Sequence, residues 1–240
     1  MAFLHGKSTG VLFNATNLGV YLNDASSNST VETAETTTFS NSAKTYITGL
    51  KDGTISLSGM FDGDAGAIDP IMAAALGVDD AVTTVGLGGF TAGNRSIMAK
   101  VDQTSYDISA PVGDVVSASV ELQADGGIDH GICLVGLNAV TATGDGTSQD
   151  NSTSSSNGGV AHLHLITNTH DGTTTIKVQH SADNSTWADL VTFAGVATTI
   201  TSQERVVVAA ATTVNRYLRA THTLAGSTGG VTYHVSFARR

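Results

Sequence analysis

Residues 53–61 read GTISLSGMF, and apolar and polar side chains alternate along this stretch. The apolar positions are Ile55, Leu57 and Phe61, and the polar positions are Thr54, Ser56 and Ser58. Because successive side chains of a strand point to opposite faces of its sheet, the pattern predicts a strand with one buried and one wet face. Residues 115–123 predict a second strand of this kind. Its apolar positions are Val116, Ala118, Val120 and Leu122, and its polar positions are Ser117, Ser119, Glu121 and Gln123.

The composition favours short strands along the whole chain. Of 240 residues, 27 are glycine and only 2 are proline, and threonine and serine recur throughout. Long stretches of helix-forming residues are missing, whereas the turn residues glycine, asparagine and aspartate are frequent. A chain of this length can bury the core of one large β domain or of two small ones.

One short helix is expected at residues 69–76. Asp69 can cap its N-terminus, Pro70 fits the first helical position, and Gly77 can close the helix in a left-handed turn. So short a helix needs burial against a sheet to be stable. The side chains expected to provide that burial are Ile71, Met72, Ala75 and Leu76.

A stretch without large apolar side chains divides the chain. Residues 142–159 read ATGDGTSQDNSTSSSNGG, a composition typical of a linker. Residues 1–141 then form a first domain, and residues 160–240 form a second domain that we expect to fold alone. Six regularly spaced strands in the second domain are typical of a β-sandwich. The predicted fold class is therefore mainly β, a sandwich or barrel with one short helix followed by a C-terminal β-sandwich.

The first 44 residues are expected to hold little regular structure. Residues 1–18 are expected to be an arm or loop that leads into a strand at residues 19–22. Residues 23–44 follow as a long polar loop or an extended ribbon, in which Val31 and Phe39 are the only large apolar side chains. Loops this long inside a compact domain are usually functional or disordered.

The charge balance argues against a nucleic-acid-binding surface. The formal net charge is −10, with 21 acidic and 11 basic side chains, and lysine and arginine are not clustered. A protein of this kind that contacts DNA does so without binding its phosphates through clustered lysines and arginines. Cys133 is the only cysteine, which excludes an internal disulfide framework. Residues 1–22 hold no apolar run suited to a signal peptide or a membrane span, so no membrane contact is expected.

Residues 36–61, TTTFSNSAKTYITGLKDGTISLSGMF, carry a family resemblance. A threonine-rich acidic loop, then Lys-Thr-Tyr-Ile-x-Gly-Leu and Asp-Gly-Thr-Ile-x-Leu-x-Gly, resembles the tail tube, or major tail, proteins of long-tailed, siphovirus-like bacteriophages. The short helix, residues 111–116 (PVGDVV) and residues 125–127 (DGG) continue the resemblance, which covers most of residues 30–137.

The resemblance implies a structural virion protein and not an enzyme. Its expected partners are copies of itself, in stacked hexameric rings whose joined sheets form a channel, and other tail proteins such as the tape measure and the terminator. DNA would pass without specific binding, and the protein would be made in the host bacterial cytoplasm and end in the virion tail. The residues expected on the channel wall are Thr54, Ser56, Ser58, Ser117, Ser119, Glu121 and Gln123, unless this wet face is an outer one. The residues expected between rings are Glu32, Glu35, Phe39 and Lys44.

The C-terminal part carries a second resemblance. Residues 178–187, VQHSADNSTW, resemble a segment of β-sandwich modules that include discoidin-like and phage-decorating ones. An Asp-Asn-Ser turn would make a hairpin, and Trp187 would cover the edge of the sandwich. Two alternative functions follow. The chain is then a carbohydrate-binding or adhesin protein that holds a surface glycan through Trp187, or a head-decorating or connector protein.

Candidate chemical sites are few, and each has a plainer explanation. His162 and His164 share one face of a strand at a spacing that zinc can use, with His180 or His222 as a third ligand. The alternative, which we favour, is that both lie on a wet or interface face. Asp62, Asp64 and Asp69 lack the ligand pattern of a calcium loop, and a turn and a helix cap explain them better. No cofactor or metal is therefore expected.

Other motifs do not form a catalytic constellation. Asp79 and Asp80 are better explained as a solvated turn than as an acid–base pair. The glycine-rich stretch at residues 86–89 does not open a helix as phosphate-binding loops do. Cys133 lies in an apolar strand, where a buried thiol is inert.

Overall fold

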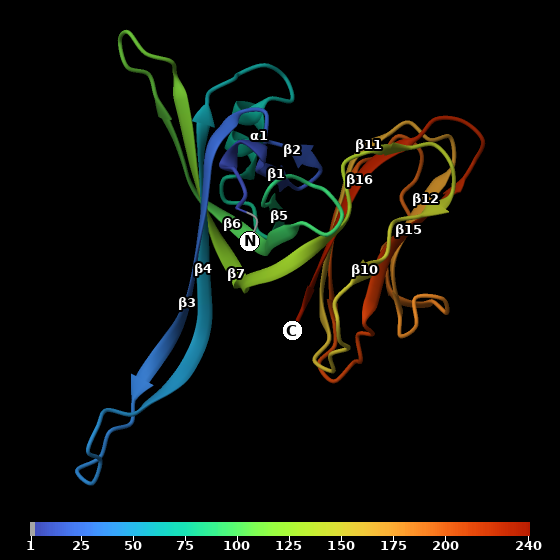
Figure 1. Cartoon of the computed structure of the whole chain (residues 1–240). Coiled ribbons are helices and arrows are strands. Elements are labelled where there is room, and N and C mark those ends of the chain that lie inside the picture. The colour runs from blue at the N-terminus through green and yellow to red at the C-terminus, as the bar shows by residue number, and fades with distance from the viewer. Residues whose placement is uncertain (1–2) are drawn as a thin grey trace. The chain divides into compact units, whose positions relative to one another are not determined.

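The computed structural model describes residues 3–240, which form antiparallel sheets with one short α-helix in the described chain (Figure 1). The mainly β fold class is confirmed. By its contacts the chain divides into two units. The sheet unit holds residues 21–81 and 99–128, and the sandwich unit holds the described residues up to Val20, residues 82–98 and residues 129–240. This grouping differs from the division at residues 142–159, and separate folding of residues 160–240 stays a prediction.

The sheet unit is a four-stranded antiparallel sheet with the strand order β3-β4-β7-β6. Its elements are β3 (Leu22–Glu35), β4 (Tyr46–Met60), α1 (Ile68–Ala75), and parts of β6 (Arg95–Ser109) and β7 (Ser117–Val135). The ladder between β4 and β7 runs from the pair Thr54 and Gln123 to the pair Met60 and Ser117. Both strands that the alternation predicted are therefore present, and they are neighbours in the sheet.

One face of this sheet is buried under α1. Within this unit, the buried side chains of β4 and β7 are Ile55, Leu57, Ala118, Val120, Leu122 and Ala124. On β6, the amide of Gln103 donates to the carbonyl of Met72 in α1 at 2.9 Å, and the Tyr106 hydroxyl donates to Asp69 at 2.9 Å. The helix is therefore fixed to the sheet by side chains of β6 as well as by apolar burial.

The predicted helix exists, but its boundary and its buried face differ from the prediction. It begins at Ile68 after Ala67, which makes no side-chain cap, so Asp69 lies in the first turn and is not the cap. Ile68 and Met72 are its buried side chains, one turn apart, whereas Leu76 is 50% exposed. One oxygen of the Asp69 carboxylate accepts from the Tyr106 hydroxyl, so the observed partner of this side chain lies on β6. Gly77 has a φ of 77°, as the predicted left-handed turn requires.

Most of residues 23–44 form a strand. β3 pairs with β4 from Leu22 opposite Gly59 to Glu35 opposite Tyr46, so the extended ribbon is confirmed and the loop is confined to the hairpin tip. The strand expected at residues 19–22 is wrong, because residues 19–21 form a turn. The residues before it instead form a short 3-10 helix, η1 (Gly6–Ser8), and two short strands of the sandwich unit, β1 (Gly10–Phe13) and β2 (Thr16–Asn17).

The sandwich unit has two sheets. In the first, β14, β11, β16 and β7 are successive neighbours, and β8 also pairs with β16. In the second, the order is β10-β15-β12-β13, and β9 pairs with β15. The bounds are β5 (Ala81–Gly86), β8 (Ala139–Val140), β9 (Gly144–Asp145), β10 (Gln149–Asp150), β11 (Gly159–Asn168), β12 (Thr173–Ser181), β13 (Ala188–Thr192), β14 (Ser202–Val208), β15 (Tyr217–Ala225) and β16 (Val231–Arg239). All six strands predicted beyond residue 160 are present, and the presumed linker supplies β9 and β10.

The core of the sandwich unit lies between these two sheets. Tyr233, Val235 and Phe237 of β16 pack with Ile176 and Val178 of β12 in one buried apolar cluster. The predicted hairpin turn is also present, since Asn184 has a φ of 60° and the Asp183 carboxylate accepts from the backbone N–H groups of Ser185 and Thr186. The pattern of alternating side chains thus located the core correctly.

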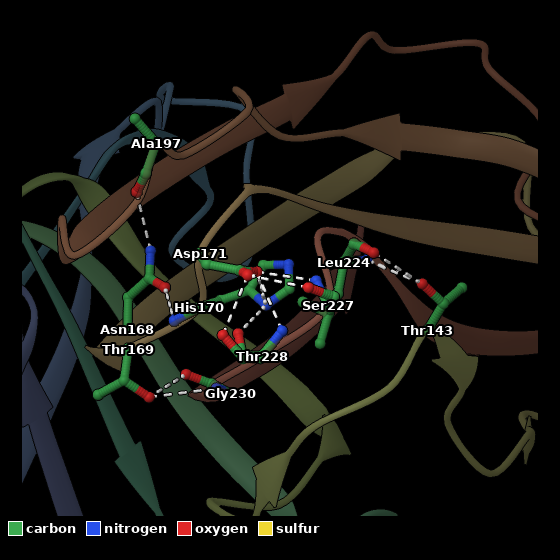
Figure 2. Close-up of polar contacts among 10 residues, drawn as sticks. All are labelled: Thr143, Asn168, Thr169, His170, Asp171, Ala197, Leu224, Ser227, Thr228 and Gly230. Atoms are coloured by element: carbon green, nitrogen blue, oxygen red, sulfur yellow. Dashed lines mark hydrogen bonds and ion pairs between the residues drawn. The ribbon is translucent and has the colours of Figure 1, made fainter.

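One end of the sandwich is closed by a polar cluster (Figure 2). The Asp171 carboxylate, between β11 and β12, accepts from the backbone N–H groups of Ser227 at 2.8 Å and Thr228 at 3.1 Å, and from both hydroxyls. His170 bonds the carbonyl of Thr228 through Nδ1, at 3.0 Å. The N–H groups of Thr228 and Ser227 hold the pKa of Asp171 well below its usual range. Asp171 therefore ties the turn between β11 and β12 to the turn between β15 and β16.

We predict that Asp171→Ala lowers the Tm of the protein and that Asp171→Asn lowers it less, because asparagine keeps one of the two acceptor oxygens whereas alanine keeps neither. Differential scanning calorimetry of both variants measures the difference. Asp79→Ala is the control, because Asp79 is exposed and makes no hydrogen bond or ion pair within residues 3–240. Equal Tm values for wild type and Asp171→Ala contradict the assignment.

Candidate assembly surface

The seven residues expected on a channel wall lie together on one face of the sheet unit. Three directly opposed pairs of the β4–β7 ladder bring six of them together: Thr54 with Gln123, Ser56 with Glu121, and Ser58 with Ser119. Ser117 lies at the end of the same ladder, opposite Met60. The Ser56 hydroxyl donates to Glu121 at 2.6 Å, and the Gln123 amide donates to the carbonyl of Gly53 at 3.1 Å. We call this surface the polar face.

β3 extends the polar face with residues that sequence reasoning missed. Asp24, Ser26 and Asn28 lie directly opposite Ser58, Ser56 and Thr54. They share the face because opposed residues of an antiparallel pair point the same way. The alternation in β4 was visible in the sequence. β3 is polar at nearly every position, so its sequence does not show which side chains lie on which face of the sheet.

On β6, the positive charge of Lys100 is balanced by two acidic side chains. Lys100 forms ion pairs with Asp80, at 2.7 Å, and with Asp125. The hydrogen bond to Asp125, followed by the one to Asp80, raises the pKa of Lys100 above its usual value. Two carboxylates therefore balance one ammonium group here. Asp79 and Asp80 are thus not an acid–base pair, since the Asp80 carboxylate is taken by Lys100.

The sheet unit has open strand edges. β3 pairs with β4 alone in the described chain, so the outer side of its 14 residues is unpaired. The outer side of β6 pairs with β5, which has 6 residues against 15 in β6, so β6 runs on past its partner. Unpaired edges of this length are templates for another strand.

Beyond its pairing with β7, the β3–β4 hairpin continues as a two-stranded arm (Figure 1). We define the arm as residues 29–52. Large apolar side chains are exposed along it: Val31 (47%), Phe39 (113%), Tyr46 (54%), Ile47 (59%) and Leu50 (75%). A two-stranded ribbon is marginally stable in water, and so many exposed apolar side chains indicate a surface that a partner covers.

The four residues expected between rings all lie on the arm. Glu35 and Lys44 form an ion pair of 3.0 Å next to the hairpin tip. Phe39 is at the tip, and Glu32 is an exposed residue of β3. The hydrogen bonds of Thr37, and then of Lys44, lower the pKa of Glu35. Whether these residues contact another ring stays a prediction.

The opposite end of the sheet also exposes apolar side chains. They flank the turn between β6 and β7 and comprise Ile108 (51%), Val112 (107%) and Val115 (59%). The register places this turn beyond the Met60–Ser117 pair, whereas the arm extends beyond the Thr54–Gln123 pair. Apolar surfaces therefore lie at both ends of the four strands.

The two histidines proposed for zinc are buried, so the expected wet face is wrong. His162 and His164 lie on the side of β11 that faces away from the apolar core, and Thr84 of β5 covers them. His164 Nδ1 donates to the carbonyl of Asn14, so its Nε2 accepts from the Thr84 hydroxyl at 2.8 Å. The same hydroxyl is 3.2 Å from His162 Nδ1. Alternation could not reveal this, because both faces of β11 are buried.

A third buried histidine belongs to this cluster. The ring of His234 is stacked with that of His164 at 6.4 Å between centroids. His234 Nδ1 donates to the carbonyl of Val135 at 2.7 Å, so its Nε2 accepts from the Ser236 hydroxyl at 2.7 Å. Burial lowers the pKa of His164 to about 4 and that of His234 to about 3, and holds the pKa of His162 well below its usual value. We call these three residues the histidine cluster; each is neutral.

The remaining metal candidates are separated and have other partners. His222 bonds the Tyr233 hydroxyl and the carbonyl of Ala142, and His180 accepts from the N–H of Asn215. Asp62 accepts from the backbone N–H of Asp64 in a turn. No group of three histidine, cysteine or acidic side chains suited to a metal ion occurs among residues 3–240.

The other candidates have local structural roles. Gly88 and Gly89 take positive φ values in a turn after β5. Cys133 is buried, and burial raises its thiol pKa to about 11. The Trp187 ring is stacked under the Arg219 guanidinium at 4.3 Å, and a role in glycan binding stays a prediction. No helix in the described chain is long and apolar enough to cross a membrane.

No protein-family model matches this chain, and no curated protein matches it. Among solved structures, a chain of the "Virion of native gene transfer agent (GTA) particle" is 16% identical, with a TM-score of 0.44, and the match covers 53% of this chain and 98% of that one. A chain of the anti-feeding prophage cap (AFP tube terminating cap) is 14% identical, with a TM-score of 0.45 and coverages of 55% and 93%. The SPP1 Dit protein, described as a paradigm of hub adsorption apparatus in Gram-positive infecting phages, is 10% identical, with a TM-score of 0.38 and coverages of 96% and 98%.

At these identities and TM-scores, the function has to be argued from the residues of this chain. Its own geometry offers a polar face, two open edges and apolar ends, all on the sheet unit. It offers no comparable exposed cluster of catalytic side chains among residues 3–240.

We predict that the histidine cluster makes the protein acid-sensitive. An unfolded histidine takes up a proton below a pH of about 6.5, whereas the folded cluster stays neutral to a pH of about 4. Stability is therefore complete above that range and falls as the pH drops, by up to about 4 kcal/mol per pH unit for three groups. Urea unfolding at a series of pH values measures this slope.

His162→Gln removes one of the three groups, so its slope between pH 6 and 4.5 should be smaller than that of the wild type by up to about 1.4 kcal/mol per pH unit, the contribution of one group. His5→Gln is the control, since His5 is exposed. The comparison uses slopes, so a lower stability of the His162 variant at neutral pH does not affect it. Identical slopes for wild type and His162→Gln contradict the prediction.

Proposed function

We propose that this chain is a structural subunit of a phage tail tube, in which copies join edge to edge into rings and the rings stack. The observation that carries the proposal is the combination found in the sheet unit: a bare polar face, two open strand edges and exposed apolar surfaces at both ends of the strands. The resemblance of residues 30–137 to tail tube proteins supports the same conclusion.

Edge pairing supplies the contact within a ring. The outer side of β3 in one copy pairs with the free part of β6 in the next, which satisfies the backbone groups of both edges. A closed ring of copies removes every open edge, as a barrel does. A head-to-tail contact of this kind closes when the rotation between copies divides the circle evenly.

The polar face is the one that lines the channel. The opposite face of each sheet is covered by α1 within the same unit, so only the polar face remains free to face a lumen. Six copies of a four-stranded sheet give a barrel of about 24 strands. With about 4.8 Å between strands and a tilt of about 40°, its circumference is about 150 Å and its backbone diameter about 50 Å.

Stacking uses the apolar ends. The arm of one ring carries Phe39 and Leu50, and the turn between β6 and β7 carries Ile108, Val112 and Val115. Because these surfaces lie at opposite ends of the strands, the arm of one copy meets the turn of a copy in the next ring. Burial of such side chains stabilises the contact by about 1.5–3 kcal/mol for each large one that becomes fully buried.

A hydroxyl-rich, acidic channel suits the passage of DNA. The polar face presents serine, threonine and glutamine side chains together with Glu121 and Asp24. A positively charged wall would bind phosphates and hold the duplex, whereas a neutral to negative wall repels it and lets it slide.

Negative-stain electron microscopy of the purified protein tests the proposal. Rings or tubes with an open centre are the expected result. A cryo-EM map of such tubes then shows whether β3 pairs with β6 of the next copy. Particles that remain discrete monomers at high protein concentration overturn the proposal, as does a map with the polar face on the outside.

We predict that Phe39→Ser combined with Leu50→Ser abolishes long tubes and leaves a folded, soluble subunit, because both side chains are exposed within one copy. Tube length in electron micrographs is the measurement, and circular dichroism checks the fold. Val207→Ser is the matched control, as Val207 is an exposed apolar residue (48%) of the sandwich unit. Normal tube lengths in the double variant contradict the stacking role of the arm.

We also predict that lysines at Ser117, Ser119 and Glu121 together make the tubes retain duplex DNA, because they place cations on the channel wall. Retention should fall steeply as salt is raised. A sedimentation assay with short labelled duplexes measures it. Lysines at Asp189, Thr192 and Thr223 are the control, since this triple variant changes charge equally on the sandwich unit. If both triple variants retain the same amount of DNA, the polar face does not line the channel.

A further inference from the structure

A small polar cavity lies at one end of the sandwich unit. Its volume is about 200 Å³, and its lining residues are Arg95, His130, Gly131, Ile132, Asn151, Phe237 and Arg239. Phe237 and Ile132 are directly opposed on β16 and β7 and form an apolar floor. His130 and Arg239 are two residues away from them on the same strands, so they point to the same side as the floor. The lining contains two arginines and a histidine, and it contains no carboxylate.

Both arginines of the cavity lack an acidic partner, unlike every other arginine of the chain. Arg216 pairs with Asp150, and Arg219 pairs with Asp145. Arg205 and Arg240 both pair with Asp129. Within residues 3–240, neither Arg95 nor Arg239 forms an ion pair. In a chain with a net charge of −10, two unmatched guanidinium groups at one cavity form an isolated positive site.

The guanidinium group of Arg239 is held in place by main-chain oxygens. Nη1 donates to the carbonyls of Thr153 and Val214, each at 3.0 Å, and Nη2 donates to those of Asn215 and Arg216. Its Nε is buried and has no hydrogen-bond partner. Burial lowers the pKa of Arg239. The carbonyls fix the side chain and leave its formal charge unmatched.

We propose that this cavity binds a phosphate group, either free inorganic phosphate or a small phosphate monoester. Two guanidinium groups match the charge of about −1.5 to −2 that a phosphate monoester carries at neutral pH. Arg95 supplies N–H groups in the planar fork that fits phosphate oxygens. Arg239 supplies its positive charge and its unpartnered Nε, because carbonyls take its Nη groups. The His130 ring and the Asn151 side chain lie beside them as further polar groups.

The geometry favours a small ligand over a nucleic-acid strand. The two unpaired guanidinium groups lie at one cavity of about 200 Å³ and do not continue as a stripe, because each of the other arginines pairs with an aspartate, with Asp129 shared by Arg205 and Arg240. Strand-binding proteins instead follow the backbone with a long basic groove. The site belongs to the sandwich unit, and its proposed ligand does not depend on tube assembly.

Isothermal titration calorimetry of the full-length protein with inorganic phosphate at low salt tests the proposal. We expect binding with one site per chain, and a dissociation constant at least about tenfold weaker for Arg95→Gln, which loses one charged donor to the phosphate. Arg95 is exposed, so this variant should keep the wild-type fold. Arg239→Gln is a second variant, and its Tm without phosphate separates a folding defect from a binding defect.

Lys177→Gln is the control, because it removes one positive charge on the second sheet, away from the cavity. Its phosphate affinity should equal that of the wild type. Glycerol phosphate and a short DNA duplex are titrated in parallel, and we expect the monoester to bind like phosphate and the duplex not to compete. The proposal is overturned if millimolar phosphate gives no binding heat, if Arg95→Gln binds as the wild type does, or if the duplex displaces phosphate.

Discussion

The antiparallel ladder between β4 and β7 is the contact on which the sheet unit depends. It joins segments 57 to 69 residues apart in sequence, Met60 with Ser117 and Thr54 with Gln123, and fixes the direction in which every side chain of the two strands points. A shift of one residue would place Leu57 and Val120 in water and would bury Ser56 and Glu121. The burial of the apolar set under α1 therefore also sets the composition of the polar face.

Alternation along single strands predicted this part of the fold because one of its faces is wet. The same reasoning located all six strands beyond residue 160 and the Asp183 turn. It failed for β11, where leucines and histidines alternate and both sets are buried. The buried imidazoles form hydrogen bonds with Thr84, Asn14 and Val135, which are distant in sequence. No local sequence pattern predicts such partners. The face of β3 was hidden for the opposite reason, since nearly all its residues are polar.

The helix shows a further limit of local signals. Asp69 before Pro70 has the composition of a helix cap, and in the structure its carboxylate instead accepts from Tyr106, a residue of β6. The helix begins at Ile68, so Asp69 lies in its first turn, and the observed partner of its side chain is a tertiary one. The cavity at Arg95 and Arg239 lies beyond sequence reasoning for the same reason. The two arginines of the cavity differ from the others because they have no aspartate partner. Which arginine has such a partner can be read only from the structure.

The two units divide the physical tasks of the chain. The sandwich unit buries its apolar side chains within itself, since its two sheets enclose an apolar core and Asp171 closes one end. The sheet unit does not, because it keeps one face bare, two strand edges open and an apolar arm in water. A two-stranded arm gains little stability alone, and exposed Phe39 and Leu50 weaken the case for a monomer. In the proposed tube, strand pairing and apolar burial against further copies satisfy these groups, so the features that leave the sheet unit incomplete are the ones on which the proposed assembly rests.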